Sequence, residues 1–501
     1  MKTLRAVWVL SCLAVMPVPA ASRITLGMAS NGSLIEADLA GADLPSRARI
    51  LLIGGMDGSK ESSDAVYNEL NWFEATSRER NQYLLAAITR SNPAGAKLAF
   101  PPAGDAYRDN AESHVLWRWM ATWTPDLVIV VGADPGGLVT AMLREAVAGV
   151  GRIPVQRVDA KRGILAAMKA PAKSPARLEA EKRLARTPRQ VAVEMGKVYG
   201  HDLAEAVYIP AVAVMARLRM GHLDDVERIV EPYFKDPKKS LLKATGSHLS
   251  GHLLFADLAM RTGKPEYTAM ARAAADLGFT ESGQMRESMP YHNQMSDSVF
   301  MGCPILVKAG QLTGDRKYYD MALRHFRFMR NLDERSDGLW RHSPKDEAAW
   351  GRGNGFAALG MALSLLDLPE DHPAHAEMLA SFRTLVAALG KHQDVTGMWR
   401  QVVDHPGAYR ELTATCMIAY SISRAIRRGW LDVRTYRPMV DHAWDAVKIR
   451  VASNGGLMDV CEGTGAQASL NDYLKRKAIL GRDPRGGAMV LLFATEMAGL
   501  E

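Results

Sequence analysis

Residues Asp337 to Phe356 read DGLWRHSPKDEAAWGRGNGF and connect two long segments with helical periodicity. The stretch contains four glycines, two tryptophans, two arginines, a histidine and an asparagine. A connector that only turns the chain needs small polar residues, so these large side chains require another explanation. The stretch holds two patterns. The first recurs along the chain and predicts the fold, and the second predicts a site.

The first pattern is a turn glycine followed by large side chains, and it occurs four times. From Gly283 to Gly456, successive turn glycines are 55 to 59 residues apart, and each interval holds two amphipathic helical patterns. A fixed period of helix pairs predicts stacked helical hairpins. The copies are Ser282-Gly-Gln-Met-Arg286, Asp337-Gly-Leu-Trp-Arg341, Thr396-Gly-Met-Trp-Arg400 and Asn454-Gly-Gly-Leu-Met458.

The number of hairpins favours a closed ring. Residues 190–501 are long enough for about five to six hairpins of this length. Closure also removes the need for polar capping repeats, and the final segment AMVLLFATEMAGL is too apolar for a solvent-facing cap. We therefore predict an all-α (α/α)6 toroid rather than an open solenoid, with the repeated loops converging on one cavity.

The second pattern runs from Trp350 to Gly355. Three alternating glycines cost backbone entropy and are expected to pack poorly, so a ligand-binding wall explains this run better than packing does. A tryptophan face can stack on a sugar ring, and an arginine fork matches a carboxylate. For Trp340 and Trp399, which recur at equivalent positions of the repeat, packing between helices is at least as good an explanation.

The sequence pattern of residues 22–150 predicts a smaller α/β domain. Apolar runs at 49–55, 83–89 and 126–132 are typical of buried parallel strands and alternate with helix-compatible stretches.

Several phrases in this domain, among them Gly54-Gly-Met-Asp-Gly58, resemble the succinylglutamate-desuccinylase-like branch of the zinc carboxypeptidases. That family has its zinc ligands where this chain has Asp57, Lys60 and Gly132. A catalytic zinc needs three protein ligands, so the resemblance implies a degenerate peptidase scaffold that binds no metal.

The composition is that of a soluble globular protein, with 48% hydrophobic and 23% charged residues. The net charge of +7 comes from residues 151–189, which hold eleven Lys or Arg and three Asp or Glu. This segment predicts a basic, solvated linker rather than a nucleic-acid-binding surface. Three scattered cysteines after residue 21 give neither a disulfide framework nor a metal spacing, so we expect buried free thiols.

Residues 1–21 have the pattern of a secretory signal peptide. Lys2 and Arg5 precede an apolar run that ends in Val18-Pro-Ala20, where cleavage is expected. No later apolar run is long enough for a membrane span. The sequence therefore predicts a secreted or periplasmic protein.

Three stretches carry a family resemblance: Asp297-Ser-Val-Phe-Met-Gly-Cys-Pro304, Trp350-Gly-Arg-Gly-Asn-Gly-Phe356 and Glu411-Leu-Thr-Ala-Thr-Cys-Met417. Through them, residues 190–501 resemble the unsaturated glycuronyl hydrolases of glycoside hydrolase families 88 and 105. The resemblance implies an enzyme, without a cofactor, that acts on a uronate-containing oligosaccharide left by a lyase. In that family a carboxylic acid protonates C4 of the unsaturated uronate, water adds at C5, and the hemiketal opens and releases the chain.

The resemblance gives each matching residue an expected role. Asp297 matches the catalytic acid, although without the resemblance a helix cap is the better interpretation of an aspartate there. Arg352 is expected to pair with the uronate carboxylate, and Glu411 either contacts substrate or fixes a loop conformation. The other residues expected at the sugar site are His342, Trp350 and Asn354.

One departure from the family concerns a second acidic residue, which an earlier hairpin usually carries. Here that hairpin has His248 and His252, one helical turn apart, and no carboxylate. His248 is expected to contact sugar or water in place of the acid. His292 either lines the same cavity or lies on a loop surface.

Two alternative functions remain open, the first because of this departure and the second because the N-terminal domain resembles a peptidase that has lost its zinc ligands. The first is a saturated-uronate glycosidase or a polysaccharide lyase on the same fold. The second is a non-catalytic carbohydrate-binding protein.

Overall fold

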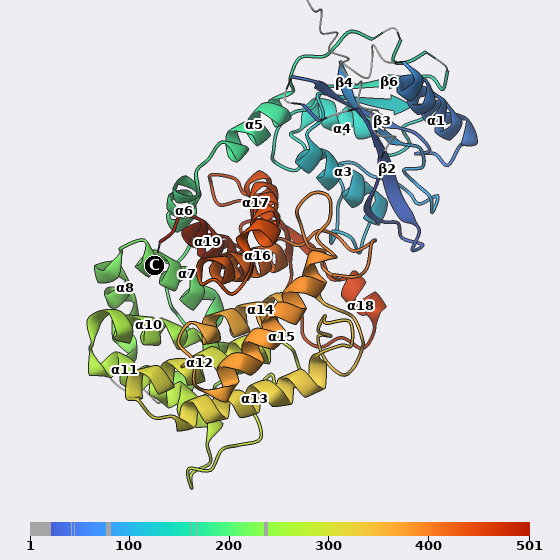
Figure 1. The fold of residues 1–501 in the computed structure, drawn as a ribbon. Coiled ribbons are helices and arrows are strands. Elements are labelled where there is room, and N and C mark those ends of the chain that lie inside the picture. The colour runs from blue at the N-terminus through green and yellow to red at the C-terminus, as the bar shows by residue number, and fades with distance from the viewer. Residues whose placement is uncertain are drawn as a thin grey trace, which may run out of the picture.

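The computed structural model describes residues 22–500 except for 42, 45, 77–81, 162, 167 and 235–238. The predicted signal peptide therefore lies outside the described residues. Figure 1 shows an α/β body, built from the N-terminal part of the chain, and a larger helical body. Within the described residues, no helix combines the length and apolarity needed to cross a membrane.

The N-terminal body is built around one mixed sheet. Its strands are β1 (Ser22–Met28), β2 (Leu34–Ala40), β3 (Ala48–Ile53), β4 (Tyr83–Ile88), β5 (Leu127–Val131) and β6 (Val155–Val158). The order across the sheet is β1-β2-β4-β3-β5-β6, where β4, β3, β5 and β6 are parallel and the β1–β2 edge is antiparallel. The predicted α/β domain with parallel strands is confirmed.

Helices cover both faces of this sheet because side chains of β3 alternate in direction. Ile50 and Leu52 pack in one cluster with helix α1 (Lys60–Ala75). Leu51 and Ile53 pack in another cluster with α3 (Ala111–Trp123) and α4 (Leu138–Arg144).

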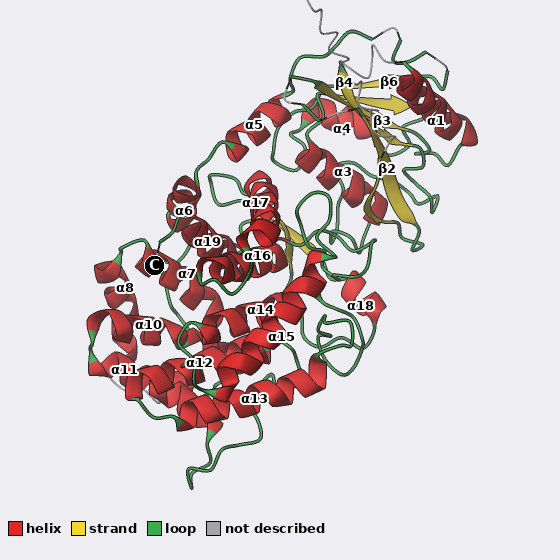
Figure 2. Cartoon of the chain, in the orientation of Figure 1, coloured by secondary structure: helices red, strands yellow, loops and turns green. Residues whose placement is uncertain are grey.

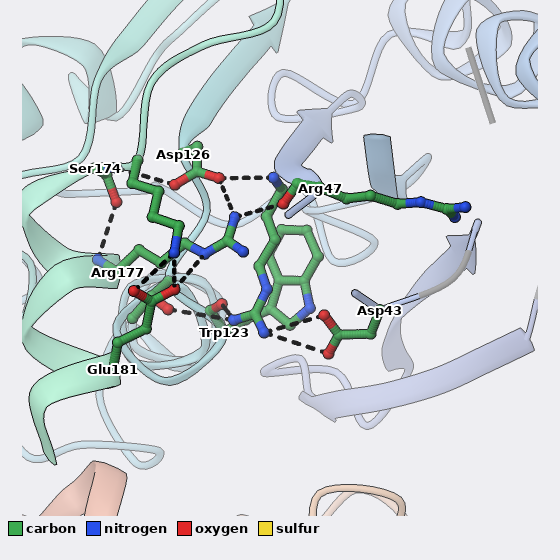
Figure 3. Close-up of polar contacts among 10 residues, drawn as sticks. Asp43, Arg47, Trp123, Asp126, Ser174, Arg177 and Glu181 are labelled. Atoms are coloured by element: carbon green, nitrogen blue, oxygen red, sulfur yellow. Dashed lines mark hydrogen bonds and ion pairs between the residues drawn. The ribbon is translucent and has the colours of Figure 1, made fainter. Parts of the chain in front are cut away.

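The basic segment 151–189 packs against this sheet. Its strand β6 pairs with β5, and its helix α5 (Pro175–Leu184) buries Arg177. Figure 3 shows Arg177 paired with Asp126, whose carboxylate also accepts backbone hydrogen bonds from Ser174 (2.9 Å) and Arg49 (2.8 Å). These parts of the segment are therefore packed rather than solvated as expected, because Asp126 gives the buried arginine a charged partner.

The helical body is a closed ring of helix pairs. The inner helices are α7 (Tyr208–Arg219), α9 (Gly246–Gly251) continued by α10 (Leu253–Thr262), α12 (Ser298–Thr313), α14 (Gly351–Leu365), α16 (Leu412–Arg427) and α19 (Pro484–Met497). Each inner helix packs on the next, and α19 packs on α7, which closes the ring and confirms the predicted toroid. The outer helices are α6 (Pro188–Gly196), α8 (Leu223–Val230), α11 (Pro265–Ala275), α13 (Lys317–Asp333), α15 (Pro373–Gly390) and α17 (Val433–Arg450).

Between α17 and α19 the chain forms a β-hairpin at the rim of the ring (Figure 2). Strands β7 (Leu457–Cys461) and β8 (Ala478–Gly481) pair antiparallel, and their connection contains the short helix α18 (Leu470–Leu474). Cys303, Cys416 and Cys461 are buried and free, as predicted.

The four repeated turns have the same backbone geometry. In each, the residue two positions before the repeated stretch donates its N–H to the carbonyl four residues later, and a glycine with positive φ donates its N–H to the carbonyl of that same residue. These residues are Thr280, Arg335, Asp394 and Ala452. In the fourth turn this glycine is Gly455, at φ 84°, and not the predicted Gly456. Gly456 instead donates its N–H to the side chain of Asn454, at 3.0 Å.

The glycines of helix α14 allow its neighbours to approach closely, so the expectation that they pack poorly is wrong. A Cβ at Gly351 would lie 2.3 Å from the carbonyl oxygen of Arg400. A Cβ at Gly353 would lie 2.7 Å from Oγ of Ser296. Farther along the helix, Gly360 lies against the backbone of α12, where a Cβ would be 2.5 Å from the nitrogen of Phe300.

We expect Gly360→Ala to lower the free energy of unfolding by about 1–3 kcal/mol, because the backbone of α12 cannot yield as a side chain can. Gly390→Ala is the matched control, since its Cβ would meet only the terminal methyl group of Met439, at 3.0 Å. Urea unfolding measures both. Equal losses in the two variants would contradict the close crossing of α12 and α14.

Candidate active site

Asp297 and His342 meet at the start of the inner helix α12. Asp297 directly precedes this helix but makes no side-chain capping bond, so its position is not explained by a cap. Its Oδ1 lies 3.2 Å from Nε2 of His342. Both atoms are buried, and neither has a hydrogen-bond partner in the described part of the chain, so the two groups are in contact without an aligned hydrogen bond. The structure thus brings together the expected acid and the expected histidine.

Tyr473 of α18 holds the other side of His342. Its phenol oxygen lies 2.8 Å from Nδ1 of the imidazole and accepts a hydrogen bond from the backbone N–H of Gln467, at 3.1 Å. We therefore assign the phenol proton to the bond with Nδ1. This assignment leaves the imidazole proton on Nε2, the nitrogen that lies beside Asp297. Sequence reasoning missed Tyr473, because a single tyrosine in a short helix carries no motif.

Trp350 and Arg352 pack behind His342. The rings of Trp350 and His342 have centroids 4.3 Å apart, and the guanidinium of Arg352 lies 4.6 Å from the centroid of the Trp350 ring. Arg352 donates to the carbonyl oxygens of Cys461 (2.8 Å) and Glu462 (2.7 Å). Both side chains are buried, so they support the histidine and the β7–β8 connection.

Asn354 and Glu411 are also engaged by the backbone. The amide of Asn354 accepts from the N–H of Trp340 and donates to the carbonyl groups of Trp340 and Trp350, which ties the two ends of the loop together. Glu411 caps α16 and accepts the backbone N–H of Cys461 at 2.8 Å. These contacts favour the conformational role considered for Glu411.

His248 and His292 lie together at the start of α9. His292 follows Tyr291 in a pair of left-handed residues, at φ 53° and 66°. A Cβ at Gly246 would lie 2.4 Å from Nδ1 of His292, so the imidazole rests on this glycine. Nδ1 of His248 accepts from the backbone N–H of Thr245 at 3.1 Å, which caps the helix. Burial lowers the pKa of His248.

The metal-binding positions of the peptidase resemblance gather no ligand set. Within the described residues, no group of three or more His, Cys, Asp or Glu side chains is placed to hold a metal ion. Asp57 instead accepts the backbone N–H of Ser59 at 3.0 Å, an interaction that lowers its pKa.

Asp333, the last residue of α13, is a second carboxyl group near the site that sequence reasoning missed. It is fully buried, and neither oxygen has a hydrogen-bond partner among the described residues. Burial raises its pKa to about 8, Arg341 opposes the rise, and the negative charge of Asp297 adds to it. A buried carboxyl group at the end of α13 is therefore close enough to Asp297 to feel its charge.

Arg485 and Tyr208 complete the surroundings. Burial raises the pKa of the Tyr208 phenol, the charges of Arg352 and Arg485 oppose this rise, and Asp297 adds to it, which places all three near this ring. Nη1 of Arg485 lies 3.5 Å from the carbonyl oxygen of Cys461, the atom that Arg352 also contacts. Arg485 keeps 18% of its side chain exposed and forms an ion pair with Asp483 at 3.7 Å.

We expect Asp333→Asn to change how stability depends on pH. The folded protein holds a proton on Asp333 up to about pH 8. The unfolded chain loses this proton near pH 4, so the free energy of unfolding falls as pH rises between these values, by at most about 1.4 kcal/mol per unit.

The asparagine variant cannot ionise and should lack this part of the fall. Urea unfolding at several pH values between 5 and 8 measures it, with Asp441→Asn on the exposed face of α17 as control. An identical slope in the parent and in Asp333→Asn would show that Asp333 is ionised in the folded protein.

Comparison with characterised proteins gives partial matches to curated relatives. The protein is 34% identical over 148 residues to Protein Atu3128 of Agrobacterium fabrum, which covers 26% of this chain and 63% of that one. It is 27% identical over 186 residues to the unsaturated rhamnogalacturonyl hydrolase YesR of Bacillus subtilis, covering 36% of this chain and 52% of that one. The matches thus span about half to two thirds of these relatives.

Solved structures share the fold of the helical body. A possible member of glycoside hydrolase family 105 from Salmonella enterica aligns with a TM-score of 0.52 and 22% identity, over 66% of this chain and 100% of that one. A polysaccharide lyase aligns with a TM-score of 0.51 and 18% identity, over 62% of this chain and 96% of that one. The profile of Glycosyl Hydrolase Family 88 matches residues 180–500, more than half of the chain, and the protein therefore belongs to this family.

Proposed function

We propose that the protein releases unsaturated uronic acid from the non-reducing end of lyase-generated oligosaccharides. The observation that carries this proposal is the buried contact between Oδ1 of Asp297 and Nε2 of His342 at the rim of the toroid. Membership of family 88 supports it, as does the partial similarity to an unsaturated rhamnogalacturonyl hydrolase. We also propose export, on the pattern of residues 1–21.

In the proposed reaction, Asp297 acts as the acid and then as the base. Nε2 of His342 lies 3.2 Å from Oδ1, so we propose Oδ2 as the oxygen from which the carboxylic acid form of Asp297 transfers its proton to C4 of the substrate. The positive charge that develops at C5 is shared with the ring oxygen, and water adds there. The water loses its proton to Asp297, which restores the acid, and the C5 hemiketal opens and expels the remaining chain.

Arg485 is the group we propose for the uronate carboxylate, in place of Arg352. The two terminal nitrogens of Arg352 are committed to the carbonyl oxygens of Cys461 and Glu462. Arg485 is partly exposed, and its ion pair with Asp483 is long, at 3.7 Å. A guanidinium in this state can form a charge-assisted pair with a carboxylate.

Asp297→Asn tests the catalytic assignment. The C4=C5 bond conjugated to the carboxylate absorbs ultraviolet light, and its hydration removes this absorbance. We expect the variant to lose about 10²–10⁴-fold in kcat, because an amide cannot supply the proton. Asp371→Asn, whose side chain is 73% exposed, is the control.

The same assay separates the alternative functions. A lyase would increase the absorbance, and hydrolysis of a saturated uronate would release sugar without changing it. If Asp297→Asn turned the substrate over as fast as the parent, Asp297 would not be the catalytic acid.

Arg485→Gln tests the carboxylate site. We expect KM to rise about 10- to 100-fold with little change in kcat, because a contact made equally in the bound and transition states lowers KM alone. Arg482→Gln, an exposed residue just before the same helix, should leave KM unchanged. An unchanged KM in Arg485→Gln would show that Arg485 does not bind the uronate carboxylate.

A further inference from the structure

The N-terminal body contacts the rim of the ring where the active-site loops lie. Tyr107 stacks on Tyr409, with ring centroids 4.7 Å apart and planes 8° from parallel. Arg410 donates to the carbonyl oxygens of Thr25 (3.0 Å) and Leu26 (3.3 Å) in β1. The loop that carries Tyr409 and Arg410 leads directly into Glu411 and helix α16.

One arginine of α3 holds both strands of the β7–β8 hairpin. Nη1 of Arg118 pairs with Asp459 of β7 at 2.5 Å, and Nη2 donates to the carbonyl oxygen of Ala478 in β8 at 3.0 Å. The phenol of Tyr107 also donates to Asp459, at 3.2 Å. Asp459 sits at a bulge with φ 63°, a conformation that a non-glycine residue keeps only when its surroundings enforce it.

The clamped hairpin carries Tyr473, the residue that contacts His342. The amide of Gln401 donates to the carbonyl oxygen of Tyr473 at 2.8 Å. An apolar cluster joins the two bodies behind the site, since it contains Ala106 of the N-terminal body together with Trp350 and Tyr473. Continuous contact therefore runs from α3, through both strands and this cluster, to the imidazole beside Asp297.

We propose that the N-terminal domain is a positioning module of the active site, in which Arg118 and Tyr107 fix the β7–β8 hairpin so that Tyr473 can orient His342. This inference rests on the proposed role of Asp297 and His342. Arg118 and Asp459 are each almost fully buried, with 6% and 5% of their side chains exposed, so neither can keep its charge unpaired. The hairpin geometry thus depends on a residue more than three hundred positions earlier in the chain.

A double-mutant cycle on the full chain tests this coupling. Arg118→Lys keeps the charge but removes the fork that spans both strands. We expect it to lower kcat about 10- to 100-fold with KM within about two-fold, because the acid is still present but its partner is misplaced. Tyr473→Phe should have a similar effect, and the double variant should be no slower than the slower single variant.

Tyr107→Phe provides a milder second variant, since it removes only the hydrogen bond to Asp459 and keeps the stack on Tyr409. Hydrogen–deuterium exchange should be faster in the hairpin, residues 457–481, for Arg118→Lys and Tyr107→Phe. Arg183→Gln is the matched control. Arg183 is equally buried and joins α5 to the carbonyl oxygen of Ile449 at 2.8 Å, without a hydrogen bond to the hairpin.

Three outcomes would overturn the inference: multiplying losses of kcat in the double variant, unchanged hairpin exchange in Arg118→Lys, or the same losses in Arg183→Gln. The hairpin exchange does not depend on activity. If the parent were inactive but exchange were faster in Arg118→Lys, the proposed function would be refuted. The result would still support the claim that Arg118 fixes the β7–β8 hairpin. An active parent with additive variants would refute the coupling alone.

Discussion

The site depends on the two contacts of His342, one with Asp297 and one with Tyr473. The three residues come from an inner-helix start, a repeat loop and the β7–β8 connection, so only a closed ring with its hairpin in place brings them together. Space for this arrangement comes from Gly353, where a Cβ would lie 2.7 Å from Oγ of Ser296 and 3.4 Å from Cδ2 of His342. The absence of a side chain at Gly353 therefore permits both the close packing of α14 and the position of His342.

Most polar residues of the site support it rather than face a ligand. Arg352, Asn354 and Glu411 are buried, and their side chains form hydrogen bonds with backbone groups of neighbouring loops. Such pairing is required, since a buried polar group without a partner costs free energy. Asp297 and Arg485 are the groups that we propose to contact the sugar.

The sequence predicted what local periodicity and short motifs encode. Helical periodicity and the 55- to 59-residue repeat predicted the ring, and the family resemblance around Asp297 singled out the side chain that lies beside His342. Contacts between distant segments were not predictable in this way. Tyr473, Asp333 and Arg485 lie in stretches without a motif, and the commitment of Arg352 to Cys461 exists only after the hairpin folds. Gly455 rather than Gly456 takes the turn, because adjacent glycines look alike until one of them must adopt positive φ.

A crystal structure of the Asp297→Asn variant with an unsaturated uronyl disaccharide tests the central claim most directly. The account predicts that C4 of the unsaturated ring lies within hydrogen-bonding distance of the side chain at position 297, with His342 still between that side chain and Tyr473. A disaccharide bound away from position 297, or a histidine turned away from Tyr473 when the sugar is bound, would contradict it.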